Sequence, residues 1–261
     1  MKTKEKLLLS VSSIILFVFS AIIAYIPFQV SFYFIADFFD ISLKLEHYKI
    51  IVTTPTGSPL WTNISVISLY GFPSILSFVL ANITRKVYDN ARKRKSNYKL
   101  FLAWLNLHFD NLFWGSIIAG IITSTDFAYF LEWLYIPLVA QIFIAIAGII
   151  LFYSLSNFSI QSFIQTSHVR VYINKENQLK YKFFIMYLPL IIGTFLFIAI
   201  SFPHSGLHER ILNLTLLIPL INTIKYHDEE NVKLVKNSKT FQPNYGIIIF
   251  IIAYILILQF I

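Results

Sequence analysis

The apolar residues of this chain are concentrated in long runs that are separated by short, more polar connections. A helix needs about 20 mostly apolar residues to cross a bilayer. On that criterion the sequence predicts seven membrane-spanning helices, at 7–27, 61–82, 100–123, 133–155, 182–202, 207–225 and 245–261. The connections are too short for a separate soluble domain. We therefore predict an all-α integral membrane protein, a bundle of about seven transmembrane helices in which residues 1–261 form a single polytopic membrane domain.

The positions of lysine and arginine predict how this bundle is oriented. If the N-terminus is cytoplasmic, 18 of the 21 Lys and Arg residues fall on the cytoplasmic side, and only Lys44, Lys49 and Arg210 fall outside. Cytoplasmic loops of membrane proteins are enriched in Lys and Arg, so we predict a cytoplasmic N-terminus and a C-terminus on the outer side. Seven basic residues between Arg85 and Lys99 fit this topology signal, and contact with anionic lipid head groups is the alternative interpretation.

Composition excludes several classes of protein. The chain is 57% hydrophobic and 13% charged, whereas soluble domains are about 45–50% apolar and about 25% charged. A soluble, a disordered and a nucleic-acid-binding protein are therefore excluded, and the net charge of +8 reflects the cytoplasmic bias of Lys and Arg. The absence of cysteine excludes disulfides, thiol catalysis and Cys-based zinc sites. Frequent Ile, Phe, Lys and Asn indicate an AT-rich genome, and hence the plasma (inner) membrane of a bacterium.

One carboxylate is predicted to lie inside the membrane. Asp110 is ten residues into the third predicted helix, about 15 Å deep at 1.5 Å per residue. Asn106 lies one turn earlier on the same face, and Gln141 of the fourth predicted helix is a candidate partner. A carboxylate in the bilayer should face the bundle interior, where it could serve an ion or proton path or contact a substrate. Alternatively, residues 100–110 form a surface helix, but the remaining 112–123 would be too short to cross.

A second candidate site lies between the fifth and sixth predicted helices. His204 and His208 are four residues apart, and Glu209 follows. Two His residues at this spacing share one face of a helix and, with a third ligand, could bind a divalent metal such as zinc. A His and a carboxylate could also transfer a proton. Alternatively, Ser205 caps the sixth helix, which would place His204 before the helix. No nucleotide, serine-hydrolase or complete zinc-protease motif is present, so no other cofactor is evident.

Small residues in the third predicted helix indicate close helix packing. Gly115 and Ala119, and likewise Ser116 and Gly120, form two small-xxx-small pairs. Small residues allow helix backbones to approach closely in lipid. We expect this face to pack against the fourth predicted helix, and a homodimer contact is the alternative.

Three functions remain open from the sequence. The first is a transport or permease-type component, which the intramembrane Asp110 and the helix-internal Pro73, Pro189 and Pro219 favour. The second is an intramembrane enzyme that acts on a lipid or peptide through the His and carboxylate side chains at the outer face. The third is a non-catalytic subunit that assembles with another membrane protein. The lipid bilayer is a partner in all three, and membrane spans alone are shared by too many families to indicate one.

Overall fold

The computed structural model describes residues 3–46, 49–91, 96–166, 180–201, 206–225 and 243–260, and it is mostly helical. The predicted all-α class is confirmed, with one short β-hairpin added. In chain order the elements are α1 (Thr3–Phe38), β1 (Leu43–Glu46), β2 (Lys49–Val52), α2 (Asn63–Asn90), α3 (Ser96–Asp110), a π-helical turn (Asn111–Gly115), α4 (Ser116–Thr123), α5 (Phe127–Trp133), α6 (Leu138–Gln165), a second π-helical turn (Phe183–Tyr187), α8 (Leu188–Ser201), α9 (Leu207–Thr215), α10 (Ile218–Lys225) and α11 (Tyr245–Phe260).

Four helices among the described residues are long and apolar enough to cross a membrane. They are Lys4–Phe38, Asn63–Asn90, Leu138–Gln165 and Lys180–Ala199, and they contain most of the first, second, fourth and fifth predicted spans. α1 has 36 residues, or about 54 Å of helix at 1.5 Å per residue. Because the hydrocarbon core of a bilayer is about 30 Å thick, α1 is long enough to extend beyond it.

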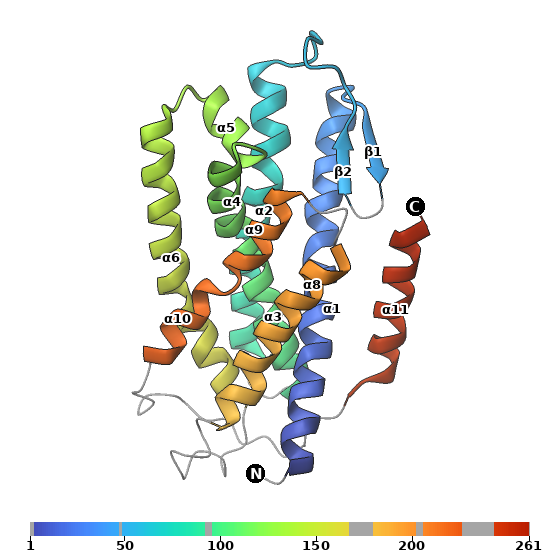
Figure 1. The fold of residues 1–261 in the computed structure, drawn as a ribbon, viewed down its shortest axis with the longest axis vertical. Helices are drawn as coiled ribbons and strands as arrows, with labels where there is room; N and C mark the ends of the chain where they lie inside the picture. Colours follow the sequence, from blue (N-terminus) through green and yellow to red (C-terminus); the bar gives the residue numbers. More distant parts are fainter. Residues whose placement is uncertain are drawn as a thin grey trace.

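The third predicted span forms the centre of the bundle. α3, the π-helical turn and α4 follow one another without a gap from Ser96 to Thr123, and this segment contacts α1, α2, α6 and α9 (Figure 1). Every residue from 102 to 112 is buried, although several are polar. The segment is therefore buried on all sides within the bundle. It is not the surface helix that the alternative interpretation placed at residues 100–110.

The sixth predicted span is not one continuous helix. α9 ends at Thr215 and α10 begins at Ile218. Pro219, in the first turn of α10, lacks the amide hydrogen that a continuous helix would need at this position, and its ring crowds the preceding turn. The prediction of a single helix at 207–225 is therefore wrong in this respect, because the proline divides the apolar run into two short helices.

The fourth predicted span begins later than its apolar run. Residues Phe127–Trp133 form the separate short helix α5. Tyr135, two residues after α5 ends, has a left-handed φ of 58°, so the helix does not continue into α6. α6 then begins at Leu138 behind Pro137, whose extended backbone precedes the first turn. α6 continues to Gln165, ten residues beyond the predicted end.

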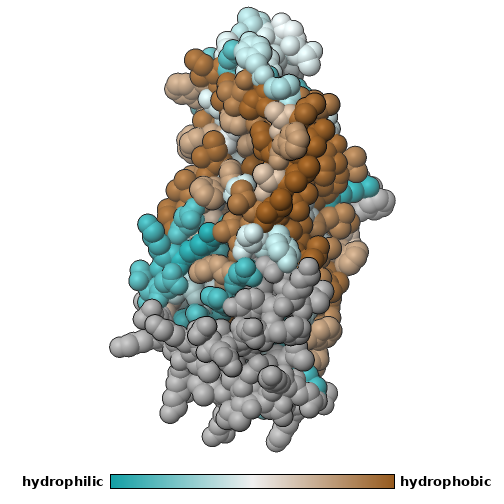
Figure 2. Space-filling view, turned by 90° about the vertical axis from the view of Figure 1, so that its left-hand side faces the viewer, coloured by the Kyte–Doolittle hydropathy of each residue, from teal (hydrophilic) through white to brown (hydrophobic). Residues whose placement is uncertain are grey.

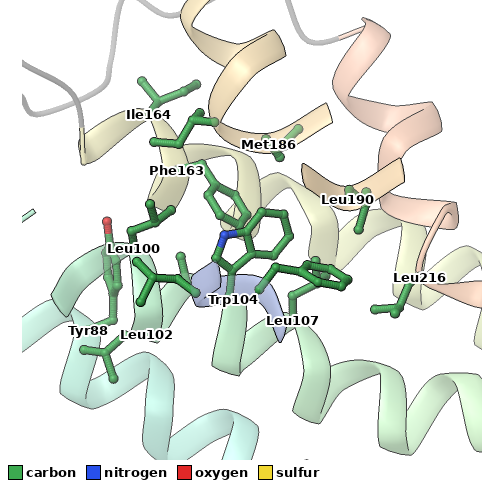
Figure 3. Packing of buried hydrophobic residues seen from close by; sticks show 14 of the residues in the cluster. Tyr88, Leu100, Leu102, Trp104, Leu107, Phe163, Ile164, Met186, Leu190 and Leu216 are labelled. Atoms are coloured by element: carbon green, nitrogen blue, oxygen red, sulfur yellow. The ribbon is translucent and has the colours of Figure 1, made fainter. Parts of the chain in front are cut away.

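The largest hydrophobic cluster is centred on Trp104 of α3 (Figure 3). The indole ring lies 4.9 Å from the Phe17 ring of α1 and 4.4 Å from the Phe163 ring of α6. Its Nε1 donates a hydrogen bond of 3.0 Å to Ser13 Oγ, and Ser13 Oγ donates one of 2.6 Å to the carbonyl of Ile185. The same side chain thus connects α3 with α1, with α6 and, through Ser13, with the helix that follows residue 180.

The small residues of the central segment face different neighbours. α4 packs against α6, as expected, and a Cβ atom added to Gly148 of α6 would be in ordinary van der Waals contact with Ile118 and Trp114. Gly115, however, faces α9, because a Cβ atom there would lie within 3.0 Å of Thr215 and Leu212 side-chain atoms. The close approach that this small residue allows is therefore used mainly by α9.

The outer surface of the bundle carries many apolar side chains. On α6, Val139 is 66% exposed, Phe143 67% and Ile150 57%. Figure 2 shows a broad hydrophobic band on this side of the molecule, with hydrophilic residues gathered at the lower left and at the top. Soluble monomers rarely expose an apolar area of this extent. The surface is therefore compatible with a membrane protein.

Candidate functional site

A buried ion pair links α2 to the central segment. Arg85 Nη2 of α2 donates hydrogen bonds to both carboxylate oxygens of Asp110, at 2.6 Å to Oδ1 and 2.5 Å to Oδ2. The Asp110 side chain is 1% exposed, and that of Arg85 is 17% exposed. A buried carboxylate is costly unless it is paired and hydrogen-bonded. The arginine therefore provides the compensation that Asp110 requires.

Asn106 and Phe158 hold the guanidinium of Arg85 in place. Arg85 Nε donates to Asn106 Oδ1 at 3.4 Å, and Asn106 Nδ2 donates to the carbonyl of Ala81 at 2.9 Å. The Arg85 Cζ atom lies 5.4 Å from the centre of the Phe158 ring of α6, a cation–π distance. The guanidinium is thus positioned by α2, α3 and α6 together, which is why it can reach Asp110.

Two members of this site, Asp110 and Asn106, were predicted from the sequence, and the third, Arg85, was not. Asp110 and Asn106 lie on the same side, as predicted. Gln141 is not the partner of Asp110, because its Nε2 donates to the carbonyl of Ile136 at 2.9 Å. Arg85 was interpreted only as part of the basic topology run, since it lies three residues beyond the predicted end of the second helix. A buried carboxylate such as Asp110 needs a cation. Basic residues near the end of a neighbouring helix, Arg85 among them, were therefore the candidates to consider.

Irregular backbone lies directly beside the ion pair. Asp110 is followed by the π-helical turn Asn111–Gly115. Asn111 Nδ2 donates to the carbonyl of Leu212 at 2.9 Å, and Thr215 Oγ1 donates to Asn111 Oδ1 at 2.7 Å. The π-helical turn is therefore attached to the end of α9, next to the break between α9 and α10. π-Helical turns inside helices are frequent at functional sites.

His108 belongs to a different environment. Its Nε2 lies 3.1 Å from the carbonyl oxygen of Phe17, and its ring packs edge-on against the Phe17 ring at 4.6 Å. His108 is 3% exposed. It thus faces α1, on the other side of α3 from Asp110, and serves as a contact between the two helices.

His208 lies in a cluster at the other end of the bundle. Its Nδ1 is 3.3 Å from Thr123 Oγ1, 3.2 Å from Thr125 Oγ1 and 3.4 Å from Asp126 Oδ2. Ser124 and Asp126 in this turn both have positive φ values, 53° and 49°. His208 therefore attaches α9 to the connection between α4 and α5. All three oxygen atoms lie near the same ring nitrogen, Nδ1. In a nucleophile–base arrangement the two ring nitrogens would face different partners, so the contacts of His208 favour an anchoring role.

The predicted metal site is only partly described. α9 begins at Leu207, with Gly206 before its first turn, so His208 and Glu209 lie in that turn. The residue that caps α9 is Gly206 and not Ser205, and the shared helical face of His204 and His208 stays a prediction. His204 itself lies outside the described residues. Within the described ranges, no group of three His, Asp or Glu side chains could hold a metal ion.

The fold and the buried pair define a helical bundle with several helices of membrane-spanning character and a charged internal site. Comparison of the chain with protein-family models, with curated proteins and with solved structures found no match. The interpretation of the site therefore rests on its own geometry.

Proposed function

We propose that this protein is a transport-type component of a bacterial plasma membrane, and that the Arg85–Asp110 pair lies on its ion or proton path. The observation that carries this proposal is the pair itself: a carboxylate that is 1% exposed, in a helix surrounded by other helices, held by one arginine. Ionisable residues inside membrane proteins commonly belong to substrate, ion or proton pathways. Asp110 can exchange a proton, and Arg85 can hold an anionic group.

The broken helix supports the same proposal. Discontinuous helices form the binding sites of many transporters, because their free backbone ends and their gaps line the site. Here the break between α9 and α10 is attached to Asn111, the residue next to Asp110, by the hydrogen bonds from Asn111 and Thr215. We propose that α9 and α10 together form one discontinuous crossing. With α1, α2, the central segment, α6, α8 and α11, this would give seven crossings and a cytoplasmic N-terminus.

The proposal predicts that Asp110→Asn abolishes proton movement through the protein. Purified protein would be reconstituted into vesicles that contain a pH-sensitive dye, and a pH gradient would be imposed with the membrane potential clamped. The wild type should equilibrate protons faster than protein-free vesicles, and Asp110→Asn should match the protein-free rate because it has no titratable carboxylate at this position.

Two further variants make this result interpretable. Asp37→Asn, which removes an exposed carboxylate near the end of α1, should behave as wild type. Asp110→Glu keeps the carboxylate and should retain part of the rate. A proton flux in Asp110→Asn equal to that of the wild type would contradict the proposal.

A further inference from the structure

Two of the three guanidinium nitrogens of Arg85 have hydrogen-bond partners among the described residues. Its Nε donates to Asn106 and its Nη2 to Asp110. Its Nη1, which carries two further N–H groups, has no hydrogen-bond partner among the described residues. Arg85 Nη1 is not among the fully buried polar atoms of the described residues that lack a partner. Because the Arg85 side chain is 17% exposed, Nη1 must reach the molecular surface.

The position of Arg85 along α2 indicates what lies at that surface. α2 ends at Asn90, and Lys86, Asp89 and Asn90 are all exposed. Ile83 and Val87 are also exposed, so the backbone of Arg85 lies at the boundary between the apolar and the polar surface of the helix. In the proposed bilayer placement this is the head-group level of the cytoplasmic leaflet. An arginine N–H that faces lipid without a partner would be costly there.

The surroundings of Arg85 favour an anion. Lys99 of α3 is 1% exposed, and its Nζ lies 5.2 Å from the centre of the Tyr88 ring, one turn along α2 from Arg85. Two basic side chains, Arg85 and Lys99, thus lie on either side of the α2 turn that carries Tyr88. Guanidinium groups bind phosphate through paired, charge-assisted hydrogen bonds, and basic pockets between helices at the cytoplasmic side bind lipid head groups.

We propose that Arg85 Nη1 binds the phosphate of an anionic phospholipid in the seam between α2 and α6, over Phe158. The same guanidinium then holds Asp110 on its inner side and a lipid phosphate on its outer side. The inference rests on the bilayer placement proposed above but not on transport activity. Asp89 is exposed one turn further along α2 and opposes the anion, so its removal should strengthen binding.

The test uses the full chain in lipid nanodiscs. Binding of phosphatidylglycerol would be titrated against a phosphatidylcholine background, with thermal unfolding and native mass spectrometry as readouts. Loss of a charge-assisted hydrogen bond should weaken binding about tenfold or more in Arg85→Gln. Lys86→Gln, which removes the neighbouring exposed charge, should change it far less, and Asp89→Asn should tighten it. Equal affinity in Arg85→Gln and the wild type would overturn the proposal.

Two arms separate this effect from loss of the ion pair and from another source of phosphate. Asp110→Asn breaks the pair but keeps Arg85, so it should bind phosphatidylglycerol at least as well as the wild type. If Arg85→Gln does not fold, Arg85→Lys keeps a charge without the planar guanidinium and should still bind more weakly. Inorganic phosphate added to phosphatidylcholine discs should not stabilise the protein; stabilisation equal to that from the lipid would assign the site to a soluble anion. Failure of the wild type to enter nanodiscs would instead contradict the bilayer placement.

Discussion

Replacing Arg85 by methionine is expected to lower the free energy of unfolding by about 3–5 kcal/mol, because it leaves Asp110 buried without its cation. Asp110→Asn should cost less. The Arg85 side chain is long and 17% exposed, so it can turn toward the surface, whereas Asp110 is 1% exposed and cannot. Unfolding of the purified variants by denaturant in mixed micelles would measure both values. Equal and negligible losses would contradict the buried pair.

The double variant separates the pair from its individual side chains. Replacing a buried ion pair by apolar residues of similar size is often neutral or stabilising. Arg85→Met combined with Asp110→Leu should therefore recover most of the stability that Arg85→Met alone loses. Lys86→Met, which removes an exposed positive charge from the next position of α2, is the matched control and should change the stability little. Additive losses in the double variant would show that the two side chains do not interact.

Trp104→Ala is the second large expected effect, a loss of about 3–5 kcal/mol. Trp104 is fully buried and packs against Phe17 and Phe163 from two other helices. Lipid is as apolar as the removed ring, so in a bilayer the loss comes mainly from the cavity and the missing contacts. The loss of the hydrogen bond to Ser13 adds to it. Thermal and denaturant unfolding of the purified variant would measure the effect.

Two other variants show which part of Trp104 matters. Trp104→Phe keeps most of the ring packing and loses the indole N–H, so it should cost about 1 kcal/mol for the hydrogen bond plus a smaller cavity term. Trp133→Ala removes an indole that is only partly buried, at the end of α5, and should be milder than Trp104→Ala. A Trp104→Ala protein as stable as the wild type would mean that the cluster in Figure 3 is not tightly packed.

The apolar runs predicted the helices well where the sequence has one strong periodicity or one long run. The segment around Asp110 is an example. Its eleven consecutive buried residues, 102–112, can all be buried only if other helices surround this helix on every side. α3 continues through the π-helical turn into α4, so Asp110 is buried inside the bundle, and its place within the bilayer stays a prediction.

The errors arise where tertiary contacts decide the outcome. Hydrophobicity alone does not show that the sixth predicted span is divided at Pro219. A proline inside an apolar run can either kink a helix or end it. Arg85 was assigned to the basic cytoplasmic connection because the predicted second span ends at residue 82, whereas α2 continues to Asn90, eight residues further. The contact from Arg85 to Asp110 spans 25 residues and depends on how α2 packs against α3, which no local pattern contains.

The central claim is a bilayer-embedded bundle whose Arg85 end is cytoplasmic, and cysteine labelling tests it most directly. The chain has no cysteine, so single Cys variants report one position each. Thr56→Cys, in the exposed turn before α2, and Asn90→Cys, at the exposed end of α2, would be treated with a membrane-impermeant maleimide. Thr56→Cys should be labelled in intact cells and Asn90→Cys only after permeabilisation. Labelling of Asn90→Cys in intact cells, or recovery of the protein in the soluble fraction, would contradict the claim.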